Sequence, residues 1–178
     1  MSPTVTIRNA ETPDEMETLR MLLREYQQSL NADLGGEHIC VSGFEQELAA
    51  LPGKYAAPNG AMLLAFVDGE PAGCVVLRPL DPAPAPNERA CEMKRLWVRP
   101  RLRGLRLGLR LTQAVIDVAA TRHYTAIYLD TAPAIMQSAN RIYRDFGFEP
   151  VARYHDREVF SGAAQDNPPE VAFFRKAL

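Results

Sequence analysis

The sequence contains few cysteines, and none are spaced to bind a metal or build a disulfide framework. Cys40, Cys74 and Cys91 make an odd number with no CxxC spacing, and the three histidines are scattered singly. Such isolated cysteines argue against disulfides and for a reducing compartment. We therefore expect no metal and a cytoplasmic protein.

Long hydrophobic runs are also missing. No stretch approaches the ~20 consecutive apolar residues of a membrane-spanning helix, and the start, MSPTVTIRNAE, has no basic segment followed by an apolar core. We expect neither a secretory leader nor a membrane partner. With 178 residues and 47% hydrophobic content, the chain can bury a core of its own, so we predict one domain over residues 1–178.

The two commonest mononucleotide-binding loops are absent. A P-loop requires GxxxxGK[ST] after a strand, and the Gly53-Lys54 pair fits neither the motif nor its setting. A dinucleotide fingerprint requires GxGxxG after the first strand, whereas Gly104 and Gly108 lie mid-chain at another spacing. Neither of these nucleotide-binding folds is predicted.

Charge is distributed unevenly along the chain. Residues 1–60 carry nine acidic and four basic side chains, a balance of −5, whereas residues 61–178 carry thirteen and sixteen, or +3. Six arginines fall within a short central stretch: Arg95, Arg99, Arg101, Arg103, Arg106 and Arg110. A nucleic-acid partner is not expected, because the net charge is −2 and few aromatic residues accompany these arginines. A solvated basic face or a phosphate site remains open.

The first half of the chain predicts strands and amphipathic helices. Residues 4–8 alternate as a strand, and apolar residues spaced three and four apart predict a helix capped by Thr12 or Asp14. Its core stripe is Met16, Leu19, Leu23, Tyr26 and Leu30. Residues 31–41 read as a loop. Ser42 and Glu45 resemble a capping box that opens a short helix to residue 51.

A hairpin follows. Residues 61–67 and 72–77 read as strands joined at Asp68-Gly69, and the four prolines within 79–86 predict a surface loop. Residues 90–98 alternate as a strand. Simple alternation places Glu92, Lys94, Leu96 and Val98 on one face, and Cys91, Met93, Arg95 and Trp97 on the other.

The second half alternates helices and strands. A helix follows Gly108 and ends near His123, and residues 124–129 read as a strand. Asp130 and Thr131 would cap a further helix that ends at Gly147, with a core stripe of Ile135, Ala139, Ile142 and Phe146. Strands over 148–154 and 170–175 flank a loop at 155–169. The pattern predicts an α/β sheet of mixed direction with helices on its faces.

The central segment RGLRLG, Arg103 to Gly108, joins a strand to a helix N-terminus. Converging backbone N–H groups and the helix dipole make such a turn a phosphate site. The same segment follows EMKRLWV and precedes LDT and NRIYRDFGF. Taken together, these motifs resemble the GNAT superfamily of acetyl-coenzyme A-dependent N-acetyltransferases, over essentially the whole chain and most sharply over residues 90–150.

The resemblance implies a fold and a reaction. The fold would be α/β of the α+β type: one mixed, mostly antiparallel sheet with a central parallel pair, 90–98 and 124–130, and helices on both faces. The reaction would be direct transfer of an acetyl group from acetyl-CoA to a primary amine of a small molecule or peptide. The protein would be a monomer or homodimer. A non-catalytic CoA-binding regulatory module is the alternative.

The resemblance also implies roles for individual residues. The pyrophosphate would lie on the backbone of Arg103, Gly104, Leu105, Arg106, Leu107, Gly108 and Leu109, with Arg101 nearby. The pantetheine arm would follow Leu96, Trp97 and Val98, where a backbone N–H polarises the thioester oxygen. Asn140 would contact the arm, and Tyr143 would donate a proton to the departing thiolate.

Arg106 departs from the usual family turn, [RQ]-x-x-G-x-[GA], whose middle position is glycine. A positive φ would cost an arginine roughly 1 kcal/mol. We expect instead an ordinary helical conformation that keeps the N–H directed at the phosphate and adds a positive side chain.

Glu92 is the expected general base for the acceptor amine, because burial would raise the pKa of its carboxyl toward neutrality. An ion pair to Lys94 or a neighbouring strand, or proton removal through a chain of waters, are the alternatives. Cys91 should point away from Glu92 and is not expected to be a nucleophile. The acceptor should lie between 31–41, the second helix and 155–169, and the acidic N-terminal third suits a cationic amine.

Overall fold

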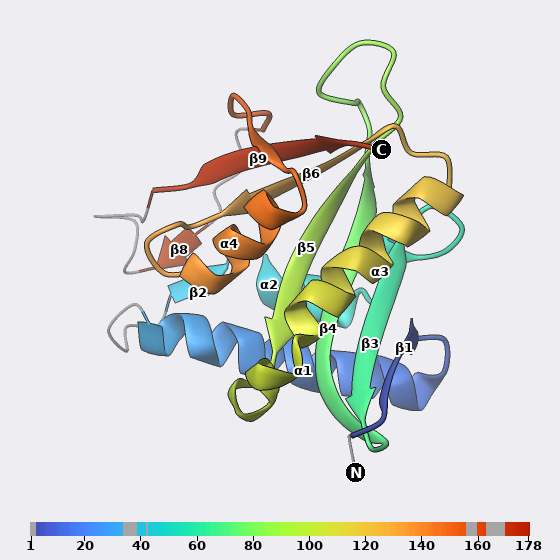
Figure 1. The fold of residues 1–178 in the computed structure, drawn as a ribbon, viewed down its shortest axis with the longest axis vertical. Coiled ribbons are helices and arrows are strands. Elements are labelled where there is room, and N and C mark those ends of the chain that lie inside the picture. The colour runs from blue at the N-terminus through green and yellow to red at the C-terminus, as the bar shows by residue number, and fades with distance from the viewer. Residues whose placement is uncertain (1–2, 34–38, 42, 156–159, 163–169) are drawn as a thin grey trace.

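A seven-stranded mixed sheet forms the centre of the computed structural model, which describes residues 3–33, 39–41, 43–155, 160–162 and 170–178 (Figure 1). The strands lie in the order β1 (Val5–Asn9), β3 (Ala61–Val67), β4 (Glu70–Leu80), β5 (Ala90–Val98), β6 (Ala126–Thr131), β9 (Ala172–Ala177) and β7 (Glu149–Pro150). Among the described strands, only β5 and β6 pair in parallel. The predicted fold class and its parallel pair are confirmed.

Helices cover both faces of this sheet (Figure 1). α1 (Pro13–Asp33) and α2 (Phe44–Ala49) contribute to one hydrophobic core, and α3 (Leu107–Thr121) and α4 (Gln137–Asp145) contribute to the other. Short 3-10 helices occupy Gly53–Tyr55 and Pro100–Leu105. A two-stranded sheet pairs β2 (Ile39–Val41) with β8 (Phe160–Gly162). Among the helices described, none is long and apolar enough to cross a membrane.

α1 begins at a capping box. The Glu15 N–H donates to the Thr12 hydroxyl at 3.2 Å, and the Thr12 N–H donates to the Glu15 carboxylate at 3.1 Å. Thr12, not Asp14, is therefore the cap. By contrast, α2 follows Gly43, which has φ +71 and no side-chain cap, so the capping box expected at Ser42 and Glu45 does not start this helix. Ser42 itself lies outside the described residues.

Several predicted boundaries shift because strands are longer or shorter than their sequence signals. The Asp68-Gly69 hairpin is confirmed, with φ values of 51° and 86°. Pro79 belongs to β4, not to the loop: it pairs with Cys91 of β5, beyond Leu77, the last residue of β4 that pairs with β3, and a proline is tolerated where a strand is paired on one side. The expected strand 148–154 shrinks to β7, and the expected 155–169 loop contains β8.

The helix after β6 also starts later than predicted. Asp130 and Thr131 complete β6 instead of capping α4, which begins at Gln137. Its predicted end at Gly147 is confirmed. Gly147 has φ +75, and the Gly147 and Phe148 N–H groups donate to the carbonyls of Arg144 and Tyr143. This is the hydrogen-bond pattern of a glycine-terminated helix.

β5 contains a bulge that reverses its alternation. Lys94 lies opposite Val76 and Trp97 opposite Cys74, so Arg95 and Leu96 together face Val75, and Arg95 has φ +60. Before the bulge Cys91 and Met93 face the α3 core; after it Leu96 and Val98 do so. The predicted grouping of Glu92 with Leu96 and Val98 is therefore wrong, because one inserted residue exchanges the faces.

A buried ion pair holds this bulge. The Arg95 guanidinium, whose side chain is 6% exposed, lies 3.0 Å from the Glu47 carboxylate of α2. Lys54 also contacts Glu47, at 2.7 Å. The rings of Phe44 and Tyr26 lie 5.4 and 6.0 Å from the guanidinium. The N-terminal helices α1 and α2 thus stabilise Arg95, the strained residue of β5.

β5 and β6 separate before the bulge is reached. They pair only over Ala90–Glu92 and Ala126–Tyr128, and Figure 1 shows the two strands diverging from that short contact. From Met93 onward, β5 pairs with β4 and with no described strand on its other side. This part of β5 therefore has an unpaired edge among the described strands.

Glu47→Gln should lower the free energy of unfolding and make that free energy depend less on pH in the acid range. Burial alone would raise the pKa of the Glu47 carboxyl, but Arg95 and then Lys54 lower it to about 2. The stabilisation from this ion pair is fully present above the pKa that the Glu47 carboxyl has in the unfolded chain. It is lost as the pH falls toward about 2, the pKa in the folded protein. The variant should lose about 3 kcal/mol at pH 7, and the difference from the parent protein should narrow in acid.

Denaturant unfolding at a series of pH values measures this effect. Glu45→Gln, on the exposed face of the same helix, is the matched control and should change little. A constant difference between the Glu47 variant and the parent protein at every pH would contradict the assignment.

Candidate active site

The turn between β5 and α3 presents free backbone N–H groups. The first helical hydrogen bond runs from the Arg110 N–H to the Arg106 carbonyl at 3.1 Å, so the N–H groups of Leu107, Gly108 and Leu109 precede the ladder. Arg103, Gly104 and Arg106 are exposed beside them. The turn therefore has the donors and the charge that an anion requires.

Arg106 adopts the left-handed conformation, with φ 57° and ψ 27°, as the N-cap of α3. The expected ordinary helical conformation is wrong. The arginine takes the backbone angles that glycine provides without strain, at a cost of roughly 1 kcal/mol. Because those angles are kept, the turn keeps its shape and its free N–H groups.

The central arginines divide into structural and exposed groups. Arg95 pairs with Glu47, and Arg99 pairs with Glu25 of α1 at 2.7 Å and donates to the Pro71 carbonyl. The Arg103 guanidinium lies 5.6 Å from the centre of the Trp97 ring. Arg101, Arg106 and Arg110 are exposed. The basic charge available to a ligand is therefore smaller than the sequence suggests.

Gly108 allows α3 and α4 to approach closely. A Cβ at this position would lie 2.9 Å from the Ile142 side chain of α4. The predicted pair Asn140 and Tyr143 lies on the same helix, and both residues are buried. A Cβ at Gly104, in contrast, would meet no atom within 4 Å. Packing explains Gly108 but not Gly104.

Asn140 has an unused acceptor. Its amide nitrogen donates to the Thr131 hydroxyl at 3.1 Å and to the Met136 carbonyl at 2.8 Å. Its Oδ1 atom is buried with no hydrogen-bond partner among the described residues. A buried amide oxygen without a donor is costly, and a ligand N–H would satisfy it.

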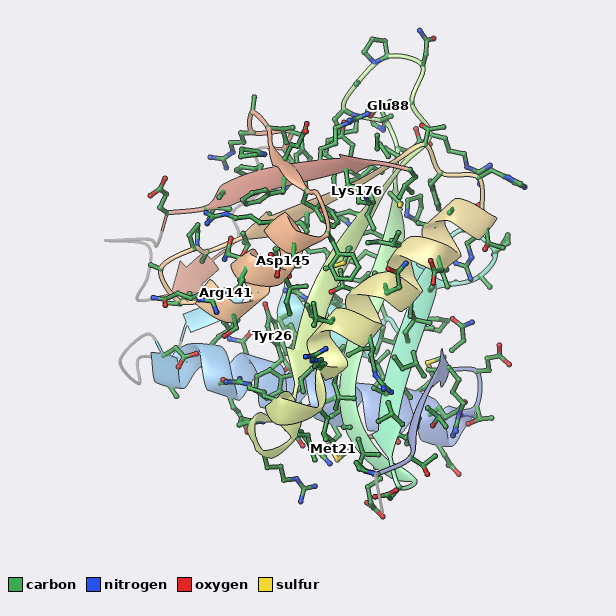
Figure 2. All side chains as sticks on the ribbon, in the orientation of Figure 1. Met21, Tyr26, Glu88, Arg141, Asp145 and Lys176 are labelled. Carbon is green, nitrogen blue, oxygen red and sulfur yellow. The ribbon has the colours of Figure 1, made fainter. Side chains whose placement is uncertain are left out.

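Tyr143 is buried, and its ring lies edge-on to Phe148 at 5.8 Å. Burial, followed by the charges of Tyr26 and Asp130, raises the pKa of the Tyr143 phenol well above its ordinary value. The hydroxyl therefore holds its proton at neutral pH. Tyr26, labelled in Figure 2, reaches this region from α1, its ring 6.2 Å from that of Trp97.

Glu92 is fully buried and bonded to cations. Arg78 of β4 donates to one carboxylate oxygen at 2.6 Å, and the Tyr154 hydroxyl donates to the other at 2.8 Å. Burial by itself would raise the pKa of the carboxyl, but Lys94 and Arg78 outweigh it and lower the pKa. The expected rise toward neutrality is wrong. The ion pair with Lys94 and a neighbouring strand, the alternative considered for Glu92, is what the structure contains.

Asp130 and His155 join Glu92 in one cluster that sequence reasoning missed. The His155 Nε2 atom lies 2.9 Å from an Asp130 oxygen, and the Lys94 ammonium lies 3.1 Å from the same oxygen. Burial would raise the pKa of Asp130, but His155 and Lys94 lower it well below its ordinary range. In the sequence, the one indication for Asp130 was its position at the end of a predicted buried strand. No local pattern indicated that His155 would join this cluster.

Described parts of two segments expected to line the acceptor site are adjacent, because residues 39–41 and 160–162 pair as β2 and β8. That these segments bind an acceptor stays a prediction.

Comparison with known proteins agrees with this geometry. Residues 19–148 match the acetyltransferase (GNAT) family. The chain belongs to the GNAT family. An uncharacterized N-acetyltransferase of Schizosaccharomyces pombe is 32% identical over 156 residues, which span 87% of this chain and 89% of the relative.

Solved structures share the fold of this GNAT chain. A GNAT-family acetyltransferase of Staphylococcus aureus superposes with a TM-score of 0.73 at 20% identity, over 98% of this chain and 99% of the other. The PaiA N-acetyltransferase of Thermoplasma acidophilum, solved with coenzyme A, gives 0.68 at 15% identity over 98% and 99%.

The residues of this GNAT chain fit coenzyme A. The free N–H groups at the start of α3 suit a pyrophosphate, the unpaired edge of β5 suits an amide-bearing arm, and Asn140 Oδ1 needs a donor. Glu92, Asp130 and His155 also offer three possible metal ligands within 4.8 Å of one another. The Lys94 ammonium already lies 3.1 Å from Asp130 and 3.8 Å from Glu92, so a cation of the chain itself neutralises them.

Arg106→Gly should raise the free energy of unfolding by up to about 1 kcal/mol, because the strain of the left-handed arginine disappears. Arg101→Gly removes the same side chain from the neighbouring 3-10 helix, which has no positive φ at that residue, and should lower stability. Denaturant unfolding of both variants checks the difference. An equal loss of unfolding free energy in the Arg106 and Arg101 variants would show that Arg106 is not strained.

Proposed function

We propose that this GNAT chain transfers an acetyl group from acetyl-CoA to a primary amine of a small molecule or peptide, by direct attack of the amine. The observation that carries the proposal is the gap between β5 and β6. Glu92 and Asp130, which Lys94 bridges, lie on β5 and β6, and Tyr143 of α4 packs in the core on one face of these strands. A thioester that entered along the unpaired edge of β5 would come between these strands, with Tyr143 as the candidate proton donor.

Coenzyme binding would use the groups described at the turn and the strand edge. The backbone from Arg103 to Leu109 would hold the pyrophosphate, and Asn140 Oδ1 would accept from an amide N–H of the arm. The thioester supplies an activated acyl group. Leu96, Trp97 and Val98 would lie along the arm, since β5 has no partner on that side.

The bulge offers a candidate oxyanion donor. An inserted residue leaves backbone groups outside the regular ladder, and the bulge occupies Arg95 and Leu96. The N–H of Leu96 or Trp97 would stabilise the negative oxygen that forms when the amine attacks. A fixed backbone dipole does this without reorganisation.

Tyr143 would protonate the departing thiolate. Its side chain is buried and its hydroxyl keeps its proton at neutral pH, so the proton is available for a thiolate released beside it. Glu92 is less suited to the base role than the sequence suggested. A general base works best with a pKa near the operating pH, whereas cations lower the pKa of Glu92. The sequence suggested two routes by which the acceptor amine loses its proton, directly to Glu92 or through a chain of waters, and both remain proposals.

The acceptor would be a cationic amine that enters between α2, β2 and β8. The acidic N-terminal third would favour its approach. The cytoplasmic location and the monomeric or homodimeric state remain predictions.

Release of the free thiol from acetyl-CoA, measured with a panel of primary amines, tests the proposal. Saturable thiol release that depends on the amine, with acetylated amine found by mass spectrometry, is the expected result. Tight coenzyme binding without release for any amine would instead favour the non-catalytic CoA-binding module.

Tyr143→Phe should lower kcat by about 10²-fold, because the thiolate loses its proton donor, while coenzyme affinity changes little. Tyr124→Phe is the matched control: the Tyr124 hydroxyl donates to the Asn59 carbonyl, away from the gap. Steady-state kinetics and calorimetric titration with coenzyme A separate the two effects. An unchanged kcat in the Tyr143 variant would remove this residue as the acid.

A further inference from the structure

The bulge in β5 lies on the part of the strand that is paired on one edge among the described strands. Arg95 and Leu96 together lie opposite Val75 of β4, whereas β6 pairs with β5 only as far as Glu92. A bulge leaves backbone groups outside the ladder that joins two strands. The direction of the peptide groups at Arg95 and Leu96 therefore decides what the unpaired edge offers to a ligand.

The peptide between Arg95 and Leu96 directs its N–H towards that edge. The Cys74 thiol of β4 donates to the Arg95 carbonyl, with 3.8 Å between sulfur and oxygen, so this oxygen faces β4. The peptide bond is trans, and in a trans peptide the carbonyl and the following N–H point in opposite directions. The Leu96 N–H is thus directed away from β4, to the side on which no described strand pairs.

Trp97 differs from Leu96 in this respect. The Arg99 N–H donates to the Ala72 carbonyl at 3.0 Å, so these two residues form a hydrogen-bonded pair of the antiparallel ladder. Such pairs recur at every second residue, and Trp97 with Cys74 is the next one along the strands. The Trp97 N–H therefore faces β4. Of the two N–H groups considered for the thioester oxygen, the geometry selects that of Leu96.

The direction of the Leu96 N–H depends on the conformation of Arg95. In an extended strand, successive N–H groups point to alternate sides. Arg95 has φ +60, and a left-handed residue interrupts this alternation, as in the anion-binding nests that successive N–H groups form. A residue with a Cβ keeps such a conformation only where its surroundings enforce it.

Glu47 of α2 holds Arg95 in this conformation. The Arg95 Nε and Nη2 atoms donate to the two Glu47 carboxylate oxygens at 3.0 and 3.3 Å, a two-point contact that fixes both the position and the direction of the guanidinium. The two side chains are only 6% and 7% exposed, so either charge without the other would be buried and unpaired. Lys54 donates to the same carboxylate at 2.7 Å.

We propose that the Glu47–Arg95 pair is the positioning device of the oxyanion site and that it holds the Leu96 N–H at the thioester oxygen. The inference rests on the proposed function. When the amine attacks, the carbonyl oxygen gains negative charge, and an N–H already fixed at hydrogen-bond distance stabilises that charge. Neither Glu47 nor Arg95 touches the reacting atoms, since both act through the backbone of β5.

Arg95→Gly and Arg95→Ala form a matched pair that separates positioning from a general structural role. Both remove the guanidinium and leave Glu47 with Lys54, but only glycine adopts φ +60 without strain. We expect kcat to fall about 10²-fold in Arg95→Ala and to stay at least about fivefold higher in Arg95→Gly. The KM for acetyl-CoA should change little in both. Steady-state kinetics measure this, at a temperature where circular dichroism shows each variant folded.

Glu47→Gln tests the other member of the pair. It removes the charge that holds the guanidinium, so kcat should fall about tenfold or more. Glu88→Gln is the control and should leave kcat unchanged. Glu88, labelled in Figure 2, accepts from Arg175 of β9 at 2.9 Å and precedes β5 at the end that pairs with β6. If Glu47→Gln or Arg95→Ala does not fold, Arg95→Lys replaces it, because lysine keeps the cation without the two-point contact and should also lower kcat.

Infrared spectra of bound acetyl-CoA, isotope-labelled at the thioester carbonyl, test the N–H without any acceptor. A hydrogen bond to the oxygen weakens the C=O bond and lowers its stretching frequency. We expect a lower frequency in the parent complex than in the Arg95→Ala and Glu47→Gln complexes, with Arg95→Gly close to the parent protein.

One frequency in every complex, or equal kcat in Arg95→Gly and Arg95→Ala, would overturn the proposal and assign the pair a structural role. A frequency that follows the variants in a protein that acetylates no amine would support the position of the Leu96 N–H and contradict the proposed function. If the parent protein binds no acetyl-CoA, both fail.

Discussion

The buried pair between Arg95 and Glu47 is the interaction on which the site depends. A positive φ at Arg95 inserts one residue into β5, and an unsupported arginine would not remain there, buried and strained. Glu47 of α2 neutralises it at 3.0 Å. The two residues are far apart in sequence, so the N-terminal helices determine the conformation of the central strand. The bulge, in turn, marks where β5 and β6 have already separated.

The separation leaves the edge of β5 that faces β6 without a partner among the described strands from Met93 onward. Tyr143 lies in the core formed with α3, on one face of the sheet, and burial is the main cause that raises the pKa of its phenol. The Asp130 carboxylate at the end of β6 is hydrogen-bonded to His155. His155 and Lys94 keep Asp130 ionised, and Lys94 also pairs with Glu92. The sheet and the helices on it therefore present a turn with free N–H groups, an unpaired strand edge, a buried phenol and an oriented imidazole.

Local patterns predicted the elements well because each pattern depends on neighbours in sequence. The α1 stripe, the Asp68-Gly69 hairpin, the strand 90–98 and the end of α4 at Gly147 were all readable. The errors have a common origin. The faces of Leu96 and Val98, the conformation of Arg106 and the pKa of Glu92 each depend on atoms contributed by distant segments. Alternation cannot reveal a bulge, and a buried carboxylate cannot be assigned a pKa until its cations are known.

Sequence by itself determined the family, the order of strands and helices, and the chemical inventory of the central turn, since these follow from periodicity and from motifs a few residues long. The tertiary structure decided which of those residues act together. It assigned Arg95 and Arg99 to ion pairs, left Asn140 Oδ1 without a donor, and brought Asp130, His155 and Glu92 from three segments into one cluster. Proton transfer requires contact at hydrogen-bond distance, and only the folded chain sets such distances between residues that are remote in sequence.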